Sequence, residues 1–320
     1  MSGRNYQRIL IIRLGALGDM ILCAPAFQAI RASYPRAIIT LLTQPAWVGL
    51  AEAMPWFDNV VTDNRPAPWQ LGVWWDLRRR VGVAEPQVVF DLQGKSRQAV
   101  LYWLLGGPWG EMDWCGNTWR CRYPRVWPPK SDWHFTDFIR AQLDVAGVAW
   151  PVQPDYDWLT APFDAVTLPK NYVLLIPGCA PSRPEKRWPH FGLLAQQLQA
   201  AGLAVVMVGT AAEQDVLDGI KQAAPEVIDL GGKTSLLQLG ALARGARGVV
   251  GNDTGPAHIA AAVGAPTLTL FAGSVNPVWS CPRGSQAQWL QAKQLPELTV
   301  ESVLLTLQQL LAGKERAHGS

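Results

Sequence analysis

Short apolar runs alternate with longer segments of helical spacing along this chain, and that alternation points to the α/β class of folds. The first apolar run, residues 8–13 (Arg-Ile-Leu-Ile-Ile-Arg), ends in the glycine loop 15–19 (Gly-Ala-Leu-Gly-Asp), and helical spacing follows over 20–34. A nearly continuous apolar run is typical of a strand buried on both faces, as in a doubly wound parallel sheet. The first half continues with strand-like runs at 37–42, 60–61 and 88–91 and with helical segments near 69–81, 96–105 and 133–146.

The regular pattern lapses over residues 150–169, where four prolines interrupt it, and then restarts. A chain of 320 residues exceeds the size that one hydrophobic core usually serves. We therefore predict two Rossmann-like domains, 1–160 and 161–320, each a doubly wound parallel sheet, facing each other across a cleft. The terminal helical segment, 300–311, could pack back on the first domain. The second half has strand-like runs at 172–176, 204–208, 227–230, 248–251 and 267–271 and helical segments at 188–201, 211–223, 235–244 and 256–263.

Charge and cysteine content exclude several classes of protein. A net charge of +3 is too small to indicate nucleic acid as a partner. The five cysteines are odd in number and include no C-x-x-C pair, so we expect a reducing cytoplasmic setting with neither a disulfide framework nor a zinc site. Residues 1–8 lack the apolar core of a signal peptide, and the apolar stretch 99–109 is about half as long as a bilayer span. We expect a soluble monomer, and a peripheral membrane contact stays open.

Residues 251–258 (Gly-Asn-Asp-Thr-Gly-Pro-Ala-His) have the pattern of a strand that turns sharply into a short helix. Pro256 suits the first helical turn and Gly264 suits its end. Such a turn leaves backbone N–H groups and the positive end of a helix dipole at a strand's carboxyl end, which suits a phosphate-bearing ligand. A simple helix cap by Asp253 or Thr254 explains the same residues, and on this octapeptide alone the cap is favoured.

Four side chains each allow a structural and a chemical interpretation. Asp19 closes the first glycine loop, where it could cap the helix or, because the helix dipole favours its ionised form, act as a general base. Lys186, in the long loop 177–189, could lie in solvent or bind a phosphate beside a helix N-terminus. Glu213 could complement a helix dipole or bind ribose hydroxyls. His258 could pack within the fold or contact the phosphate site.

Tryptophan is concentrated in the first half of the chain, with thirteen of the sixteen between residues 47 and 158. Residues 114–130 combine tryptophans with arginines, Arg120 and Arg122 among them, and contain no acid. Basic and aromatic groups together suit an anionic sugar or a membrane surface. For any single residue, a tryptophan in the core or an arginine outside it is the simpler explanation. Lys95 and Arg97 follow a strand's carboxyl end, where we expect them to face the cleft.

Taken in order, four motifs resemble those of the lipopolysaccharide heptosyltransferases of glycosyltransferase family 9. They are a strand with Gly-x-x-Gly-Asp at 15–19, Asp-Leu-Gln-Gly at 91–94, Pro-Gly at 177–178 with Lys-Arg-Trp-Pro at 186–189, and Asp-Thr-Gly-Pro-x-His at 253–258. The resemblance covers nearly the whole chain. It implies a GT-B fold in which the first domain binds the acceptor and the second binds a nucleotide sugar, typically ADP-heptose.

The resemblance also implies a chemistry and the residues that carry it. Transfer would be inverting and metal-independent, and it would need no cofactor because the nucleotide sugar is itself a substrate. Asp19 matches the general base that removes the proton of the acceptor hydroxyl. Lys186 matches a group that neutralises the departing diphosphate, Glu213 matches the ribose ligand, and Thr234 falls beside the base. The donor-binding residues implied are Ser182, Lys186, Glu213, Thr234, Asp253, Thr254, Gly255 and His258.

Two departures from the family pattern leave the substrates open. Thr234 stands where the ADP-heptose enzymes have a methionine, which leaves the nucleotide base open. The tryptophan-rich stretch 103–133 matches no acceptor motif, so the acceptor could differ from the usual inner-core sugar. Basic side chains would still suit a carboxylate or phosphate on an anionic glycolipid at the inner membrane surface. The candidates for this acceptor contact are Lys95, Arg97, Arg120 and Arg122.

Three other functions compete with heptose transfer. One is a glycosyltransferase of the same fold with another nucleotide-sugar donor or a protein acceptor. Another is a nucleotide-sugar binding protein without catalysis. A dinucleotide oxidoreductase is disfavoured, because residues 15–19 lack the full G-x-G-x-x-G fingerprint.

Overall fold

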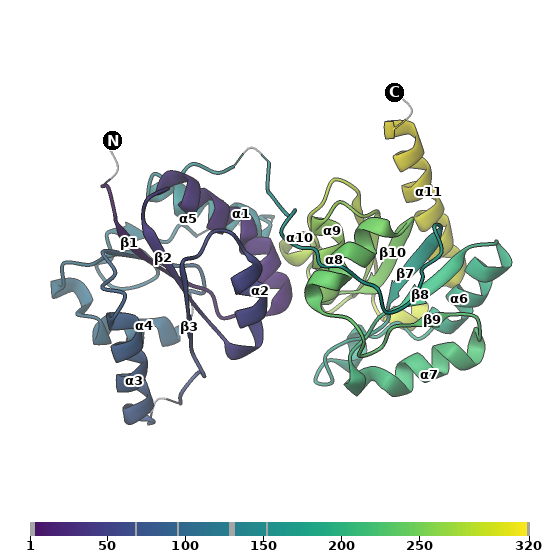
Figure 1. The fold of residues 1–320 in the computed structure, drawn as a ribbon, viewed down its shortest axis with the longest axis horizontal. Coiled ribbons are helices and arrows are strands. Elements are labelled where there is room, and N and C mark those ends of the chain that lie inside the picture. Colours follow the sequence, from purple (N-terminus) through teal and green to yellow (C-terminus); the bar gives the residue numbers. More distant parts are fainter. Residues whose placement is uncertain (1–3, 68, 95, 128–131, 152, 319–320) are drawn as a thin grey trace. The chain divides into compact units, whose positions relative to one another are not determined.

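A computed structural model describes residues 4–67, 69–94, 96–127, 132–151 and 153–318 of the chain. It consists of two compact units, Met1–Trp158 and Leu159–Ser320 (Figure 1). Each unit contains one six-stranded sheet, and the paired strands run parallel in both. The doubly wound α/β class predicted from the sequence is therefore confirmed for both units.

The sheet of the first unit has the strand order β3-β2-β1-β4-β5-β6. Its strands are β1 (Arg8–Ile12), β2 (Ile38–Thr43), β3 (Asn59–Thr62), β4 (Val88–Asp91), β5 (Asp113–Gly116) and β6 (Tyr123–Pro124). Its helices are α1 (Leu17–Ser33), α2 (Val48–Ala53), α3 (Leu71–Gly82), α4 (Ser96–Leu104) and α5 (Phe135–Val145), with the short 3₁₀ turns η1 (Pro45–Trp47) and η2 (Gly107–Trp109). The order reverses between β1 and β4, and a ligand of such a sheet binds outside the carboxyl ends of the strands at that point.

The second sheet has the order β12-β11-β10-β7-β8-β9, which repeats the order of the first when its strands are counted from β7. Its strands are β7 (Tyr172–Ile176), β8 (Ala204–Met207), β9 (Ile228–Asp229), β10 (Gly248–Asn252), β11 (Thr267–Ala272) and β12 (Ala287–Ala292). Its helices are α6 (Phe191–Ala200), α7 (Gln214–Ala223), α8 (Leu236–Gly245), α9 (Gly255–Ala262), α10 (Pro277–Ser280) and α11 (Val300–His318), with η3 (Pro184–Lys186), η4 (Ala211–Glu213) and η5 (Leu295–Glu297). The reversal point of this sheet lies between β7 and β10.

Three strands were not predicted by the sequence pattern, namely β5, β6 and β12. The first two are only four and two residues long and lie in the tryptophan-rich segment, which has no alternating pattern. The third lies at the edge of its sheet, and its six residues are half-buried or exposed. The continuous apolar run that marks a strand buried on both faces is therefore missing from it.

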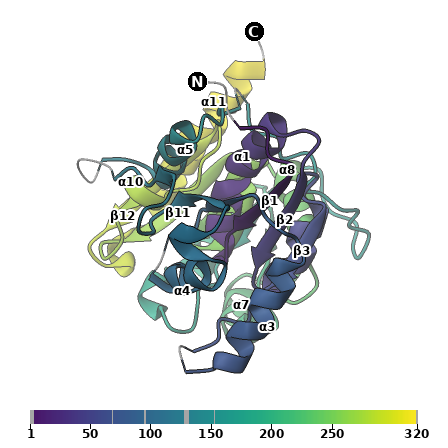
Figure 2. The same ribbon diagram turned by 90° about the vertical axis from the view of Figure 1, so that its left-hand side faces the viewer.

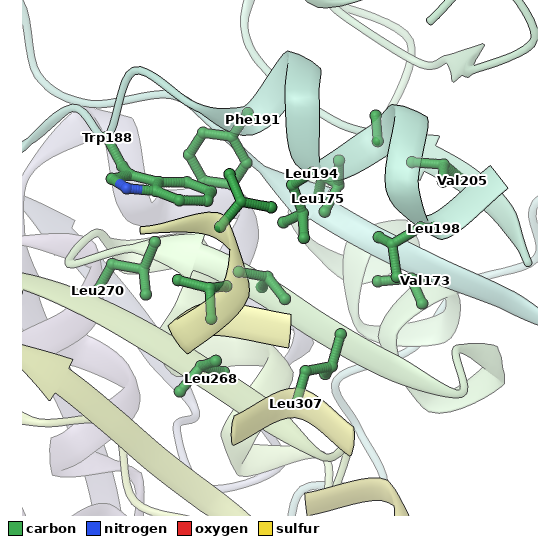
Figure 3. Close-up of a cluster of buried hydrophobic side chains, with 14 of the residues drawn as sticks. Val173, Leu175, Trp188, Phe191, Leu194, Leu198, Val205, Leu268, Leu270 and Leu307 are labelled. Atoms are coloured by element: carbon green, nitrogen blue, oxygen red, sulfur yellow. The ribbon is translucent and has the colours of Figure 1, made fainter. Parts of the chain in front are cut away.

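The core of the second unit packs α6 and α11 against the sheet (Figure 3). Leu194 and Leu198 project from α6, and Leu307 projects from α11, toward Val173 and Leu175 of β7. All five side chains are at most 2% exposed. This burial of apolar surface stabilises the position of β7 and so of the loop that follows it. Each buried side chain of this size contributes about 1.5–3 kcal/mol to the stability of the fold.

The C-terminal helix α11 contacts α6, β10 and β11 of its own unit. Leu307 and Leu311 lie against Gly248 at the start of β10, where a Cβ would come within 3.1 Å and 3.0 Å of their methyl groups. The helix therefore packs closely against the sheet at Gly248, because a larger residue there would meet Leu307 and Leu311. In the described part of the chain, no helix is both long and apolar enough to span a bilayer.

Two neighbouring leucines on α6 provide a test of this core. Leu194 is fully buried, whereas Leu193 is 47% exposed. We expect Leu194→Ala to lower the free energy of unfolding by about 2–5 kcal/mol, because it removes buried methyl groups and leaves a cavity. The matched control Leu193→Ala should change it by less than about 0.5 kcal/mol. Urea unfolding measures both, and equal losses would contradict this packing.

Candidate active site

The four sequence motifs follow the four strands that border the two reversal points. In the first unit the glycine loop follows β1, and Asp-Leu-Gln-Gly begins at the last residue of β4. In the second unit the Pro-Gly loop follows β7, and Asp-Thr-Gly follows β10. Because parallel strands end at the same edge of a sheet, each unit has one candidate site at that edge.

The glycine loop of the first unit is closely packed and needs its first glycine. Gly15 has a φ of +106°, and a Cβ on it would lie 2.3 Å from Nε1 of Trp47. The N-cap residue of α1 is Ala16, so Asp19 is not the N-cap residue that the sequence suggested, although its side chain caps the helix start from position N3. Asp19 instead lies in the first turn, and its carboxylate accepts a hydrogen bond from the backbone N–H of Ala16 (3.1 Å).

A buried arginine holds the Asp19 carboxylate. Nη2 of Arg13 lies 2.5 Å from Oδ2 of Asp19, and Nη1 of Arg13 donates to the carbonyl of Leu92 (2.5 Å). The guanidinium also lies over the ring of Phe135, 4.9 Å from its centroid. The Arg13 side chain is only 3% exposed, whereas that of Asp19 is 44% exposed. Asp19 is therefore a carboxylate with a fixed cationic partner on one side and solvent on the other.

The Asp-Leu-Gln-Gly motif ties the loop after β4 to the glycine loop. Oδ1 of Asp91 accepts hydrogen bonds from the backbone N–H groups of Gln93 (3.0 Å) and Gly94 (2.8 Å). Oε1 of Gln93 in turn accepts one from the backbone N–H of Leu14 (2.9 Å). Burial raises the pKa of Asp91, and the hydrogen bond from Gly94 and the nearby charge of Arg125 oppose that rise. The motif therefore positions the glycine loop rather than facing solvent as a reactive group.

Arg125 is a further, half-buried support of this loop. Its Nη2 donates to the carbonyl of Asp91 (2.9 Å) and its Nε donates to Oε1 of Gln142 (3.0 Å). Burial lowers the pKa of Arg125. Gly94 has a φ of +64°, and the Arg125 guanidinium occupies the space that a Cβ on Gly94 would need.

The structure does not gather the four basic residues that we expected at an acceptor site. Arg97 donates through both Nη atoms to Asp63 (2.5 and 2.8 Å) and lies over the ring of Trp74, so its fork is already occupied. Arg122 lies 3.7 Å from Asp113, at the amino end of β5 and thus at the edge opposite Asp19. Parallel strands place their amino ends together at that opposite edge, so we do not keep Arg122 in the acceptor site.

The two remaining residues of that set do not strengthen it. Arg120 is exposed and lies over the ring of Trp119, which stacks on Trp103 near the C-terminal end of α4. Arg120 therefore lies away from the carboxyl edge at which α4 begins, and we do not keep it in the acceptor site either. Lys95 lies outside the described residues.

In the second unit, Lys186 and Asp253 form an ion pair. Nζ of Lys186 contacts Oδ2 of Asp253, and the two side chains are 19% and 7% exposed. The lysine comes from η3 in the loop after β7, and the aspartate directly follows β10. The ion pair thus joins the two loops at the reversal point of the second sheet.

Asn252, which the sequence analysis did not single out, holds the lysine loop in place. Its side chain is fully buried at the end of β10. Oδ1 accepts the backbone N–H of Trp188 (3.1 Å), and Nδ2 donates to the carbonyls of Pro177 (2.8 Å) and Gly178 (3.2 Å). Both ends of the loop 177–188 are therefore fixed by one amide. The signal available in the sequence was a polar residue at the end of an apolar strand.

The Asp-Thr-Gly segment begins helix α9 as predicted, but the predicted cap is only partly correct. Thr254 is the N-cap residue. Its hydroxyl donates to the carbonyl of Asn252 (3.3 Å) instead of accepting a helix N–H. Pro256 lies in the first turn, and Gly264 follows the helix with a φ of +82°. His258 is buried on the same helix.

A pocket at the same edge brings together three of the predicted donor-binding residues, Glu213, Thr234 and Thr254. Its volume is about 100 Å³. Oε2 of Glu213 accepts hydrogen bonds from the backbone N–H of Thr210 (2.7 Å) and from its hydroxyl (2.9 Å). Gly178 permits this arrangement, because a Cβ there would lie 2.0 Å from the Glu213 carboxylate. Glu213 therefore fits both interpretations from the sequence, because it supports the start of a helix and also lines a pocket where it could meet ribose hydroxyls.

The remaining donor-binding candidates lie around that pocket. Gly255 is the first residue of α9, beside the pocket residues Thr254 and Pro256. Ser182 is exposed in the lysine loop and is not among the residues that line the pocket. In the described part of the chain, no group of three or more histidine, cysteine, aspartate or glutamate side chains is placed to hold a metal ion.

Comparison with known proteins identifies the class. A profile of glycosyltransferase family 9 (heptosyltransferase) matches residues 74–305, which is more than half of the chain. Over 311 residues the chain is 27% identical to lipopolysaccharide heptosyltransferase 2 of Salmonella typhimurium, covering 88% of this chain and 87% of that one. The chain therefore belongs to glycosyltransferase family 9, and it is a glycosyltransferase.

Solved structures agree on the fold. The structure of E. coli ADP-heptose LPS heptosyltransferase II matches with a TM-score of 0.76 at 23% identity, covering 96% of this chain and 99% of that one. E. coli heptosyltransferase WaaC with ADP matches with a TM-score of 0.77 at 19% identity, covering 95% and 99%. The family resemblance and the GT-B architecture expected from the sequence are thereby confirmed.

Asn252 provides a test of the loop anchor. We expect Asn252→Ala to lower the free energy of unfolding by about 1–3 kcal/mol, because it leaves buried backbone groups of the loop 177–188 without partners. Urea unfolding measures this loss. Asn171 is exposed next to β7 and makes the matched control Asn171→Ala, which should change the free energy of unfolding by less than about 0.5 kcal/mol. An unchanged stability of the Asn252 variant would contradict its role as an anchor.

Proposed function

We propose that this enzyme transfers heptose from ADP-heptose to a lipopolysaccharide core acceptor, or to a related anionic glycolipid, by an inverting and metal-independent displacement. The observation that carries the proposal is the Asp19 carboxylate, which a buried Arg13 holds at the carboxyl edge of the first sheet while leaving it accessible. Membership of the heptosyltransferase family supports the sugar, and the names of the relatives support the donor and the acceptor.

In this mechanism Asp19 acts as the general base. As the acceptor oxygen attacks the anomeric carbon of the donor, its proton passes to the Asp19 carboxylate, and the bond from that carbon to the diphosphate breaks. One displacement at one carbon inverts its configuration. Arg13 is the positioning residue, because its two contacts fix where the carboxylate lies and supply a cation beside it. The half-exposed Asp19 side chain is accessible to a hydroxyl from solvent.

The second unit would bind the donor and stabilise the charge of the leaving ADP. Lys186 and the backbone N–H groups around Thr254 and Gly255 would bind the diphosphate, since a lysine and a helix N-terminus both favour anions. Lys186 is now paired with Asp253, so the diphosphate would have to compete for the ammonium group. Ser182, exposed in the lysine loop, and His258, buried on α9, are further candidates for donor contact.

The nucleoside would lie over the pocket beside the diphosphate, with only part of it inside, because the pocket has a volume of about 100 Å³. Glu213 is proposed to bind the ribose hydroxyls and Thr234 to lie beside the base, because both line the pocket at the carboxyl edge. On the acceptor side, Lys95 and Arg97 stay candidates for an anionic group. Arg97 would first have to exchange its ion pair with Asp63 for that group.

Asp19→Asn tests the proposed base. We expect it to lower the rate of heptose transfer by about 10²–10⁴-fold, because the amide keeps the shape of the side chain but cannot take up the proton. Affinity for ADP-heptose should stay within about twofold, since donor binding is assigned to the other unit. Transfer to a deacylated core acceptor, followed by mass spectrometry, gives the rate, and calorimetric titration gives the affinity.

A matched control comes from the same unit. Asp144 is exposed on α5, and Asp144→Asn should leave the rate unchanged. Transfer by Asp19→Asn at the wild-type rate would rule out the proposed base. The wild-type assay repeated in EDTA tests metal independence, and loss of transfer there would rule out that part of the proposal.

Thermal shifts with nucleotides test the donor. We expect ADP to raise the unfolding temperature more than UDP or GDP does, because the nucleotide that binds most tightly stabilises the native state most. A ligand at ~100 times its Kd stabilises it by about 2.7 kcal/mol. Lys186→Ala should weaken ADP binding about 10–100-fold, which corresponds to the free energy of one hydrogen bond to a charged group. Lys170→Ala is the matched control, since Lys170 is exposed in the same unit. A shift with UDP or GDP alone would favour a different nucleotide-sugar donor.

A further inference from the structure

Four tryptophans form an exposed surface on the first unit, which we call the tryptophan face. They are Trp75 on α3, Trp103 on α4, Trp109 in η2 and Trp119 in the loop between β5 and β6. Their exposed fractions are 57%, 46%, 77% and 58%. Single exposed apolar residues are common, but a group of large exposed indoles marks an interaction surface.

Direct contacts join these residues into one surface. The ring centroid of Trp103 lies 5.4 Å from that of Trp109 and 6.2 Å from that of Trp119, with the second pair stacked. Arg78 connects the other side, because its Nε donates to the carbonyl of Leu104 (2.7 Å) and its guanidinium lies over the ring of Trp75. Helices α3 and α4, which carry these residues, contact each other and lie side by side (Figure 2).

The indoles are held in place by the backbone around them. Gly106 and Gly107 both have positive φ values, of +113° and +57°, and a Cβ on Gly107 would lie 2.8 Å from the ring of Trp103. The buried Tyr102 donates its hydroxyl to the carbonyl of Trp119 (3.0 Å). Two glycines and one tyrosine thus keep the indoles in a fixed arrangement at the surface.

Positive charge surrounds the tryptophan face. Arg78 and Arg120 each lie over one of its indoles, and neither forms an ion pair with another described residue. Asp76, on the same helix as Trp75, is held by two other arginines, Arg79 and Arg80. Glu111 is an exposed acid near Trp109. The two arginines outweigh this single acid.

A hollow of about 1380 Å³ adjoins the face. Trp75 and Arg78 line it together with Arg4 and Arg8, and it lies within the first unit. Arg79, Asp76, Glu85 and Glu111 also line it, and Asp76 and Glu85 pair with Arg79 and Arg8. The four arginines of this lining exceed its three acids by one charge, and Arg78 is the one among them without an ion pair to another described residue. Lipid headgroups would enter the hollow beside Arg78 while the indoles stay at the surface.

We propose that the tryptophan face docks the enzyme on a bilayer that contains anionic lipids. Indole rings favour the boundary between headgroups and acyl chains, where one end of the ring is wet and the other is apolar. Arginines at the rim are attracted by anionic headgroups. The inference rests on the surface alone and not on the sugar that the enzyme transfers, so it can be tested without donor or acceptor.

Vesicle co-sedimentation tests the proposal with the full chain. We expect wild-type protein to bind vesicles of phosphatidylethanolamine and phosphatidylglycerol, and to bind vesicles of phosphatidylcholine alone more weakly. Trp109→Ser/Trp119→Ser should weaken binding to the anionic vesicles at least about tenfold, because it removes two exposed indoles. Arg78→Gln and Arg120→Gln should each weaken it about fivefold at low salt, the equivalent of about 1 kcal/mol per arginine.

The matched control is Trp289→Ser. Trp289 is 42% exposed on β12 of the second unit, outside the tryptophan face, and its loss should change binding by less than twofold. Unfolding temperatures near that of the wild type show that the variants fold. Three results would overturn the proposal: no binding by the wild type, wild-type binding by the double tryptophan variant, or an equal loss for Trp289→Ser. A dimer that the double variant abolishes, without vesicle binding, would assign the face to a second copy of the chain.

Discussion

The common direction of the strands is the constraint on which the rest of the structure depends. In both units the order reverses between the first strand and the fourth, and all carboxyl ends lie at one edge. The loops after those two strands are therefore adjacent, although 79 positions separate Arg13 from Leu92 and 75 separate Asn252 from Pro177. Asp19 lies in the first helical turn after one of these loops, and Lys186 lies in another of them. The chemistry assigned to each unit is possible only because the sheet brings these loops together.

One buried polar side chain at a strand end holds each loop pair. In the first unit Arg13 contacts the loop after β4 and also fixes Asp19. In the second unit Asn252 contacts the loop after β7, which carries Lys186. An unmade hydrogen bond is costly inside a protein, so such contacts favour one arrangement of each loop over others. The groups that would react or bind are themselves less buried, which keeps them accessible to a ligand.

Tryptophan shows where local pattern stops being informative. Trp74, Trp114 and Trp188 are buried, whereas the four of the tryptophan face are exposed, and nothing in the flanking residues separates the two groups. Burial depends on what packs against a side chain from elsewhere in the chain. The same limit applies to Arg97 and Arg122. Arg97 pairs with Asp63, which is distant in sequence, and Arg122 pairs with Asp113, which belongs to no motif.

The sequence by itself determined the α/β class, the two parallel sheets and the four motifs at the strand ends. Strands buried on both faces and glycine loops at their ends have signatures that extend over fewer than about ten residues, so they can be read locally. The short or edge strands β5, β6 and β12 lack that signature and were missed. Only the tertiary structure decided that Arg13 pairs with Asp19, that Asn252 anchors the lysine loop and that Arg97 is occupied by Asp63. These contacts depend on which strands become neighbours and on the exact packing around them, and no local pattern of residues encodes either.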